Sequence, residues 1–234
     1  MVESVYDLSI VIPAYNEEET IGKVISELFL LKEEIPSMEI IVVDDCSSDK
    51  TVSIVSNFPS VRLIKHHRNM GKGAALKTGF RLANGRVVVI QDADMEYHPK
   101  ELVHIVKPIL HGNADVVYGT RFKHKPSGMS FTHFIGNIIL SKVFSLLYRK
   151  NITDVMTGYK AFSSEVLKLV ELKENGFAVE VELTAQVLQN GCRFREVPIE
   201  YSYRPHGVSK IQISDGIKSL IQIIVFTFGF NNSH

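Results

Sequence analysis

The sequence predicts an α/β protein with a mainly parallel, Rossmann-like sheet flanked by helices and a mixed C-terminal half. In the first half of the chain, short apolar runs alternate with stretches in which apolar residues recur at helical spacing. Continuous apolar runs are typical of strands buried on both faces, and their alternation with helices predicts parallel β-α-β units. Polar clusters directly follow the apolar runs, at the sheet edge where such proteins bind ligands.

Strands and helices are expected to alternate from residue 8 to residue 118. The predicted strands cover residues 8–12, 38–43, 61–64, 87–90 and 114–118. The predicted helices between them cover residues 20–31, 51–58, 73–82 and 101–110. Further helices are expected over 131–148, 163–172 and 179–189, and a strand over 197–203. Because the alternation is lost there, we expect antiparallel or peripheral elements in the second half.

Residues 1–215 are expected to form one domain, and residues 216–234 an apolar C-terminal helix. The segment 217–230 is rich in isoleucine and phenylalanine, but a bilayer crossing needs about 20 mostly apolar residues. The segment is shorter than that and contains Lys218 and Gln222. An interfacial or buried helix is therefore expected rather than a spanning one.

The composition argues against several classes of protein. Apolar residues make up 45% of the 234 residues, which is typical of a globular chain with a full core. The 26 lysines and arginines balance the 26 aspartates and glutamates, so no overall charge favours nucleic acid as a partner. Cys46 and Cys192 form no zinc or disulfide pattern, and the N-terminus lacks the features of a secretory signal. We expect a cytoplasmic protein.

Asp92 and Asp94 follow the predicted strand 87–90 and are candidate metal ligands. Residues two apart on an extended segment point to the same side, so their carboxylates can share one ion. Carboxylate oxygens without nearby cysteine or paired histidine favour Mg²⁺ or Mn²⁺ over zinc. Glu96 would add at most a third contact. In the alternative interpretation, Asp92 caps a turn or helix and the other two carboxylates are only solvated.

Two more clusters at predicted strand ends are candidates for nucleotide binding. Asp44 and Asp45 are adjacent carboxylates that repel each other unless donors such as base N–H or ribose hydroxyl groups approach them. Lys72, within Gly71-Lys72-Gly73, opens the next predicted helix. This segment can present a cation and backbone N–H groups to a phosphate, or it can simply be a flexible helix start.

Cations after two later strands are candidates for phosphate binding. Arg121 lies just beyond the predicted strand 114–118. A second group follows the predicted strand 197–203 and consists of Arg204, His206, Ser209 and Lys210. Cations there would neutralise a diphosphate leaving group or an acceptor phosphate, unless this loop is only solvated.

Four segments together resemble the family 2 glycosyltransferases in their order and spacing. They are residues 11–18 (VIPAYNEE), 42–47 (VVDDCS), 69–75 (NMGKGAA) and 91–94 (QDAD). Within that family the chain is similar to the dolichyl-phosphate mannose synthases and related polyprenyl-phosphate hexosyltransferases, through residues 119–122 (GTRF), Asp154 with 157–162 (TGYKAF), and 207–210 (GVSK). The resemblance extends over residues 6–215 and implies a GT-A fold.

The resemblance implies a nucleotide site at the first two strand ends. Pro13, Tyr15 and Glu17 would line the base and ribose, and Asp44 or Asp45 would accept hydrogen bonds from them. The nucleotide would be part of a nucleotide-diphosphate sugar, either GDP-mannose or a UDP-hexose.

The resemblance also implies a metal and a set of phosphate contacts. Mg²⁺ or Mn²⁺ would bind to Asp92 and Asp94, with Glu96 at the position of a third ligand. The implied cations are Arg121 for a lipid phosphate, and Arg204 with Lys210 for the donor diphosphate.

These roles predict inverting transfer of a hexose, with mannose as the first candidate, to a polyprenyl or dolichyl phosphate. Such a phosphate is largely anionic at neutral pH, so no general base is needed. Two alternatives stay open. The acceptor can be a saccharide or protein hydroxyl, with Asp154 as the base, or the chain can be a non-catalytic nucleotide-binding subunit. A sugar nucleotidyltransferase is disfavoured because no glycine-rich basic loop follows the first strand.

Peripheral association with the cytoplasmic face of a membrane is expected. The apolar C-terminal helix and the basic segment 123–125 would provide the contacts with lipid. The membrane surface is therefore a predicted partner.

Overall fold

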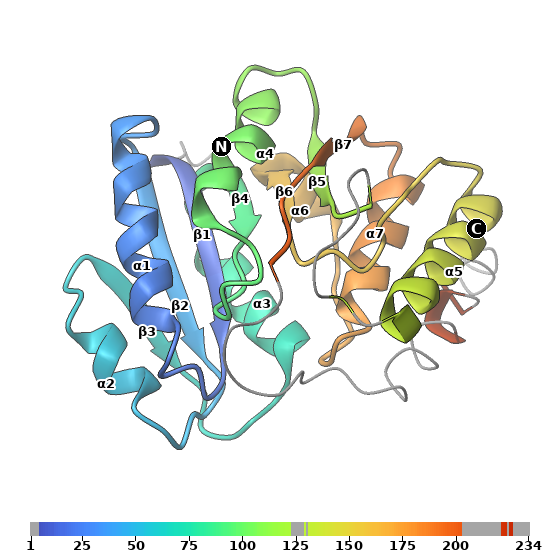
Figure 1. Cartoon of the computed structure of the whole chain (residues 1–234). Helices are drawn as coiled ribbons and strands as arrows, with labels where there is room; N and C mark the ends of the chain where they lie inside the picture. The colour runs from blue at the N-terminus through green and yellow to red at the C-terminus, as the bar shows by residue number, and fades with distance from the viewer. Residues whose placement is uncertain (1–4, 123–128, 130, 203–220, 224, 227–234) are drawn as a thin grey trace.

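The computed structural model describes residues 5–122, 129, 131–202, 221–223 and 225–226. Within these ranges a seven-stranded sheet forms the centre of the protein, and helices cover both of its faces (Figure 1). The strand order is β3-β2-β1-β4-β6-β5-β7. Their bounds are β1 Tyr6–Ala14, β2 Met38–Asp44, β3 Val61–Lys65, β4 Gly85–Ile90, β5 Val116–Thr120, β6 Lys160–Ser163 and β7 Phe194–Pro198.

The sheet is parallel except at β6. Strands β3, β2, β1 and β4 pair in parallel, and β7 pairs in parallel with β5. Strand β6 lies antiparallel between β4 and β5. The expected Rossmann-like sheet with a mixed second half is confirmed.

Two helical layers enclose the sheet. One layer contains α1 (Ile21–Leu30) and α4 (Leu102–Leu110), and the other contains α3 (Lys72–Leu82), α6 (Ser164–Leu169) and α7 (Val179–Gln189). Strand β1 shows why its sequence is continuously apolar. Ile10 and Ile12 pack in the cluster of the first layer, and Val11 between them packs against Leu76 of α3 on the opposite face. Both faces of the strand are therefore buried.

The remaining helical elements complete these layers or lie outside them. They are α2 (Thr51–Ser56), α5 (Phe131–Tyr148) and the short 3-10 helices Leu31–Glu33 and Pro99–Glu101. Val55 of α2 packs in the core of the first layer. Helix α5 packs against the outer side of α7, where Leu140 and Phe144 meet Val181 and Ala185. This contact adds a separate small core to the second half of the protein.

Three elements differ from the sequence predictions. Strand β6 was not predicted, because it has only four residues and begins with a lysine. The strand predicted over 197–203 instead runs from Phe194 to Pro198. Its register is set by β5, since Val116 is paired with Phe194 and Arg193 hydrogen-bonds to Asp115 just before the two strands. Helix α6 also ends before the predicted residue 172, at Leu169.

Part of the apolar C-terminal segment is described, and it packs on the protein. Residues 221–223 and 225–226 are helical, and the fully buried Ile223 joins the cluster between α5 and α7. Gln222 donates a 2.6 Å hydrogen bond to Glu174. The rest of the predicted helix lies outside the described residues. Within the described part, no helix combines the length and apolar character needed to cross a bilayer.

Candidate active site

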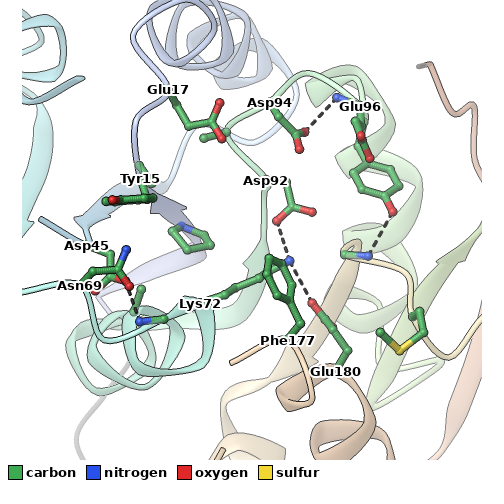
Figure 2. A pocket seen from close by; sticks show the side chains of 18 of the residues that line it. Tyr15, Glu17, Asp45, Asn69, Lys72, Asp92, Asp94, Glu96, Phe177 and Glu180 are labelled. Carbon is green, nitrogen blue, oxygen red and sulfur yellow. Dashed lines mark hydrogen bonds and ion pairs between the residues drawn. The ribbon is translucent and has the colours of Figure 1, made fainter. Parts of the chain in front are cut away.

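A cavity of about 290 Å³ opens at the carboxyl ends of β1 and β4 (Figure 2). Nine of the predicted site residues line it: Pro13, Tyr15, Glu17, Asp45, Lys72, Asp92, Asp94, Glu96 and Arg121. Asp44 does not line the cavity. Arg204, His206, Ser209 and Lys210 lie outside the described residues, and so does the basic segment 123–125. The ligand edge expected from the sequence thus gathers residues from five separate segments of the chain.

The turns after the strands contain residues with unusual backbone conformations. Asn16, Cys46 and Met95 follow β1, β2 and β4, and all have positive φ angles of 50°, 68° and 63°. Residues other than glycine rarely adopt such angles, and they concentrate at functional sites. The sharp turns hold the polar side chains that follow each strand at the end of the sheet.

Asp92 and Asp94 lie on the turn after β4 and both face the cavity. Oδ1 of Asp94 accepts a 3.1 Å hydrogen bond from the backbone N–H of Glu96. Oδ1 of Asp92 is 2.8 Å from Nζ of Lys72. The two carboxylates line one cavity, and a lysine already pairs with the first.

The donor set of the cavity fits a hard divalent cation. Asp92 and Asp94 offer only oxygen atoms, and Mg²⁺ in particular is commonly bound by one or two carboxylates together with substrate phosphates. A methyl group at Gly158 would overlap with Oδ2 of Asp92, so only glycine leaves room for this carboxylate. Among the described residues no group of three histidine, cysteine, aspartate or glutamate side chains is arranged to hold a metal. The Glu96 carboxylate instead hydrogen-bonds to Tyr201. Its role as third ligand stays a prediction.

Lys72 is the first residue of α3 and bridges two carboxylates across the cavity (Figure 2). Its Nζ is 2.8 Å from Asp92 and 2.9 Å from Oε1 of Glu180, in the first turn of α7. Burial acts to lower the pKa of Lys72, but the charges of Asp92 and Glu180 outweigh burial and raise it. The lysine is therefore a permanent cation in the cavity at neutral pH.

Glu180 and the buried Lys160 were not among the predicted site residues. Lys160 opens β6, is fully buried, and forms an ion pair with Oε2 of Glu180. It also donates to the backbone carbonyl of Val155 at 3.0 Å. Burial lowers the pKa of Lys160, whereas the charges of Lys160 and Lys72 outweigh burial and lower the pKa of Glu180. The signal in the sequence was a lysine next to the apolar and aromatic residues Tyr159, Ala161 and Phe162.

Asp45 and Asp44 bind groups of their own chain. The carboxylate of Asp45 accepts from the backbone N–H groups of Met70 and Gly71 and lies 2.7 Å from Nδ1 of His66. Asp44 accepts from the backbone N–H of Ser47. Asp45 therefore fixes the loop that leads into α3, and contacts of either carboxylate with a nucleotide stay predictions.

Arg121 follows β5 and is held by Asp154. Its Nε and Nη2 each donate a 2.7 Å hydrogen bond to the fully buried carboxylate of Asp154. Burial would lower the pKa of Arg121, but Asp154 outweighs burial and raises it. A guanidinium has five N–H donors, so this pair leaves capacity for an anion in the cavity.

Further lining residues were not predicted as site residues, and they include Asn69, Tyr97, Met156 and Phe177. Asn69 lies within one of the segments that carry the family resemblance. The others come from segments that the sequence predicts as irregular, so no periodic pattern pointed to them.

The model of the family described as glycosyl transferase family 2 matches residues 9–170. This chain belongs to that family. The match runs from within β1 through β6 and contains nearly all of the cavity, but it ends before Glu180 on α7. The expected family and GT-A fold are both confirmed.

Relatives of this family 2 chain match it over nearly its whole length. An uncharacterized protein of Methanocaldococcus jannaschii is 33% identical, over 94% of this chain and 91% of that protein. UDP-N-acetylglucosamine–dolichyl-phosphate N-acetylglucosaminyltransferase of Methanococcus voltae is 28% identical, over 94% and 96%. Dolichyl-phosphate beta-glucosyltransferase ALG5A of Trichomonas vaginalis is 29% identical, over 95% and 74%. The chain is thus similar to transferases whose names specify dolichyl phosphate.

Solved structures share the fold. Glucosyl-3-phosphoglycerate synthase from Mycobacterium tuberculosis, in complex with Mn²⁺, UDP and phosphoglyceric acid, superposes with a TM-score of 0.76 and 22% identity, over 96% of this chain and 78% of that chain. The same synthase with Mg²⁺ and UDP superposes with a TM-score of 0.74. That synthase thus binds a divalent metal together with UDP, and its likeness to this chain is one of fold.

Proposed function

We propose that this family 2 glycosyltransferase moves a hexose from a nucleotide-diphosphate sugar to a polyprenyl phosphate such as dolichyl phosphate. The observation that carries the proposal is the single cavity in which Asp92, Asp94, Lys72 and Arg121 meet. It combines carboxylates for a metal with cations for phosphate groups. The names of two relatives that match nearly all of this chain support dolichyl phosphate as the acceptor.

The donor is proposed to be a UDP-hexose or GDP-mannose. The relative from Methanococcus voltae is named for UDP-N-acetylglucosamine, and the one from Trichomonas vaginalis for glucosyl transfer. These names favour a UDP-hexose over the mannose that the sequence resemblance suggested. Pro13, Tyr15 and Glu17 belong to β1 and the turn that follows it, line the cavity, and are proposed to contact the base and ribose.

A metal is proposed to bind Asp92 and Asp94. Mg²⁺ or Mn²⁺ would supply positive charge to the diphosphate as it leaves the sugar. Lys72 adds a cation of the chain itself to the same cavity. Arg204 and Lys210, outside the described residues, are proposed to complete the contacts with the diphosphate.

The acceptor chemistry suits the arrangement around Arg121. A phosphate monoester has a second pKa near 6, so it attacks as an anion without a general base. Arg121 is proposed to orient that anion toward the sugar, so that alignment contributes to the rate. A hydroxyl acceptor would need a base, and both oxygens of the candidate Asp154 accept hydrogen bonds from Arg121. This engagement favours the phosphate acceptor over a saccharide or protein hydroxyl.

Binding to the cytoplasmic face of a membrane is part of the proposal. Helix α5 exposes apolar side chains, with Phe131 77% and Leu146 79% exposed. A polyprenyl acceptor resides in the bilayer, and an exposed apolar helix face is a means of approaching it. We therefore add α5 to the C-terminal segment and the basic segment 123–125 as candidate contacts with lipid.

The first test combines a donor screen with the substitution Asp94→Ala. UDP-glucose, UDP-N-acetylglucosamine and GDP-mannose are each incubated with dolichyl phosphate and Mn²⁺, and the glycolipid formed is measured. We expect turnover with one donor and a loss of about a hundredfold or more in Asp94→Ala, because metal stabilisation of a leaving group contributes several kcal/mol.

The control for this test is Asp7→Ala, which removes a half-exposed carboxylate outside the cavity and should keep full activity. Circular dichroism should show both variants folded. Full activity of Asp94→Ala would refute the metal assignment. Transfer to saccharides alone would refute the lipid acceptor, and nucleotide binding without any turnover would support a non-catalytic subunit.

A further inference from the structure

Four side chains of alternating charge form a continuous series from the cavity into the core. Asp92 pairs with Lys72, Lys72 with Glu180, and Glu180 with Lys160. The side chains of Asp92 and Lys72 are 18% and 15% exposed, those of Glu180 and Lys160 only 3% and 0%. The four formal charges cancel, which makes their burial tolerable because an unpaired buried charge is strongly unfavourable.

Asp92 has little room for a cation other than Lys72. Its Oδ1 is bound by the lysine, and its Oδ2 lies against Gly158, where a methyl group would overlap with it. A divalent ion at this carboxylate would lie next to the ammonium group of Lys72 and repel it. Binding of a metal therefore requires the lysine side chain to move.

Glu180 offers Lys72 another partner at the same position. Its Oε1 is 2.9 Å from the ammonium group, so Lys72 can leave Asp92 and remain paired. The lysine stem is long and flexible, whereas its backbone is fixed. Asn175 accepts hydrogen bonds from the N–H groups of Gly73 and Ala74, and Asp45 accepts from Gly71. Only the side chain of Lys72 needs to shift.

We propose that Lys72 is an internal cation that pairs with Asp92 in the metal-free protein and leaves this carboxylate when a metal binds to it. Glu180 is the positioning residue that keeps Lys72 paired after it has moved. Glu180 thereby sets the affinity of the site for metal without being one of the proposed metal ligands. Lys160 limits the effect of Glu180 on the metal affinity, because its charge attracts the same carboxylate toward the core. This inference rests on the proposed metal site.

The test measures Mn²⁺ binding by calorimetry on the full chain, with and without UDP. In Lys72→Met the competitor is removed, so Mn²⁺ should bind about tenfold more tightly without nucleotide. In Glu180→Gln the lysine loses its second charged partner and stays on Asp92, so Mn²⁺ should bind about tenfold more weakly. Substitutions around a metal site commonly change affinity by about this much or more.

Glu180→Gln leaves Lys160 without its charged partner and can fail to fold. The double variant Glu180→Gln/Lys160→Met replaces the buried pair with neutral groups, a change that proteins often tolerate. It should also bind Mn²⁺ more weakly than the unsubstituted protein. Lys23→Met, which removes an exposed lysine on α1, should leave the affinity unchanged.

The outcomes separate this inference from the proposed function. Equal affinities in the unsubstituted protein and Lys72→Met would overturn the inference and leave the metal site intact. Weaker binding in Lys72→Met would also overturn the inference and leave the metal site intact, because the lysine would then assist metal binding instead of competing with it. Binding only in Lys72→Met would support the inference. Absence of Mn²⁺ binding in every variant, with UDP present, would overturn the metal site and the inference with it.

Discussion

Gly158 determines how closely the chain approaches Asp92. A β-carbon at this position would overlap with Oδ2 of Asp92, and the Gly158 N–H donates a 3.2 Å hydrogen bond to the hydroxyl of Tyr97. Where a backbone packs this closely against a functional carboxylate, only glycine fits. The carboxylate is therefore positioned by a residue far from it in the sequence.

The substitution Gly158→Ala is expected to displace Asp92 and lower kcat/KM by about tenfold or more, since small misplacements of reacting groups are costly. Transfer kinetics with saturating Mn²⁺ provide the measurement. The matched control is Gly136→Ala on α5, where the added methyl group meets no atom within 4 Å. Equal activity of the two variants would show that the contact with Asp92 does not matter.

Single residues were predictable where the sequence pattern marks a strand end. Asp92 and Asp94 stand out because they directly follow a buried strand, and Lys72 because it lies between two glycines. Glu180 and Lys160 were not predictable in the same way. Their roles depend on each other and on Lys72, which lies more than a hundred residues earlier than Glu180, and no local pattern records such a pairing.

At the scale of elements, an ion pair joins the starts of β5 and β7. Asp115 accepts hydrogen bonds from the backbone and guanidinium of Arg193, at 2.8 Å and 2.6 Å. These hydrogen bonds lower the pKa of Asp115. Because the pKa of Asp115 is lowered in the folded state, the pair stabilises the fold at pH values above the ordinary carboxyl pKa of about 4. This stabilisation is lost as the pH falls and the carboxyl group is protonated.

We expect Asp115→Asn to lower the midpoint of thermal unfolding at pH 7. The difference from the unsubstituted protein should shrink below about pH 4, where the carboxyl group becomes protonated. Calorimetric scans between pH 7 and pH 3 give the comparison. A difference that stays constant with pH would mean that the charge of Asp115 does not stabilise the strand ends.

Strands β1, β2, β4 and β5 were predictable because they are buried on both faces and therefore largely apolar. Strand β6 escaped prediction because its position between β4 and β5 comes from pairing with strands distant in sequence. The register of β7 has the same origin. Its start is fixed by contacts with β5, whereas its apolar residues continue past Pro198.

At the scale of the whole molecule, α5 presents an apolar surface outside the core. Phe131, Ile135 and Ile139 are exposed at four-residue spacing, so they lie along one helix face, and Leu146 is exposed further along. In the C-terminal segment, Ile221 is also exposed. Exposed apolar side chains that gather in this way often mark a site of interaction.

The substitutions Ile139→Glu and Leu146→Glu are expected to reduce co-sedimentation with vesicles that contain anionic lipid by about tenfold, because charge opposes burial in the bilayer interface. Leu30→Glu on α1, where the leucine is 68% exposed, is the control and should bind as the unsubstituted protein does. Equal binding of all three variants would exclude α5 as the membrane contact.

The series of charges from Asp92 to Lys160 has a consequence for dividing the chain into parts. The family match ends at residue 170, but the partner of Lys72 lies on α7 and the last strand pairs with β5. A fragment trimmed to the matched region would keep both candidate ligand carboxylates, but it would leave Lys160 without a counter-ion and Lys72 paired with Asp92 alone. The unit that can be engineered or exchanged among relatives therefore extends at least through β7.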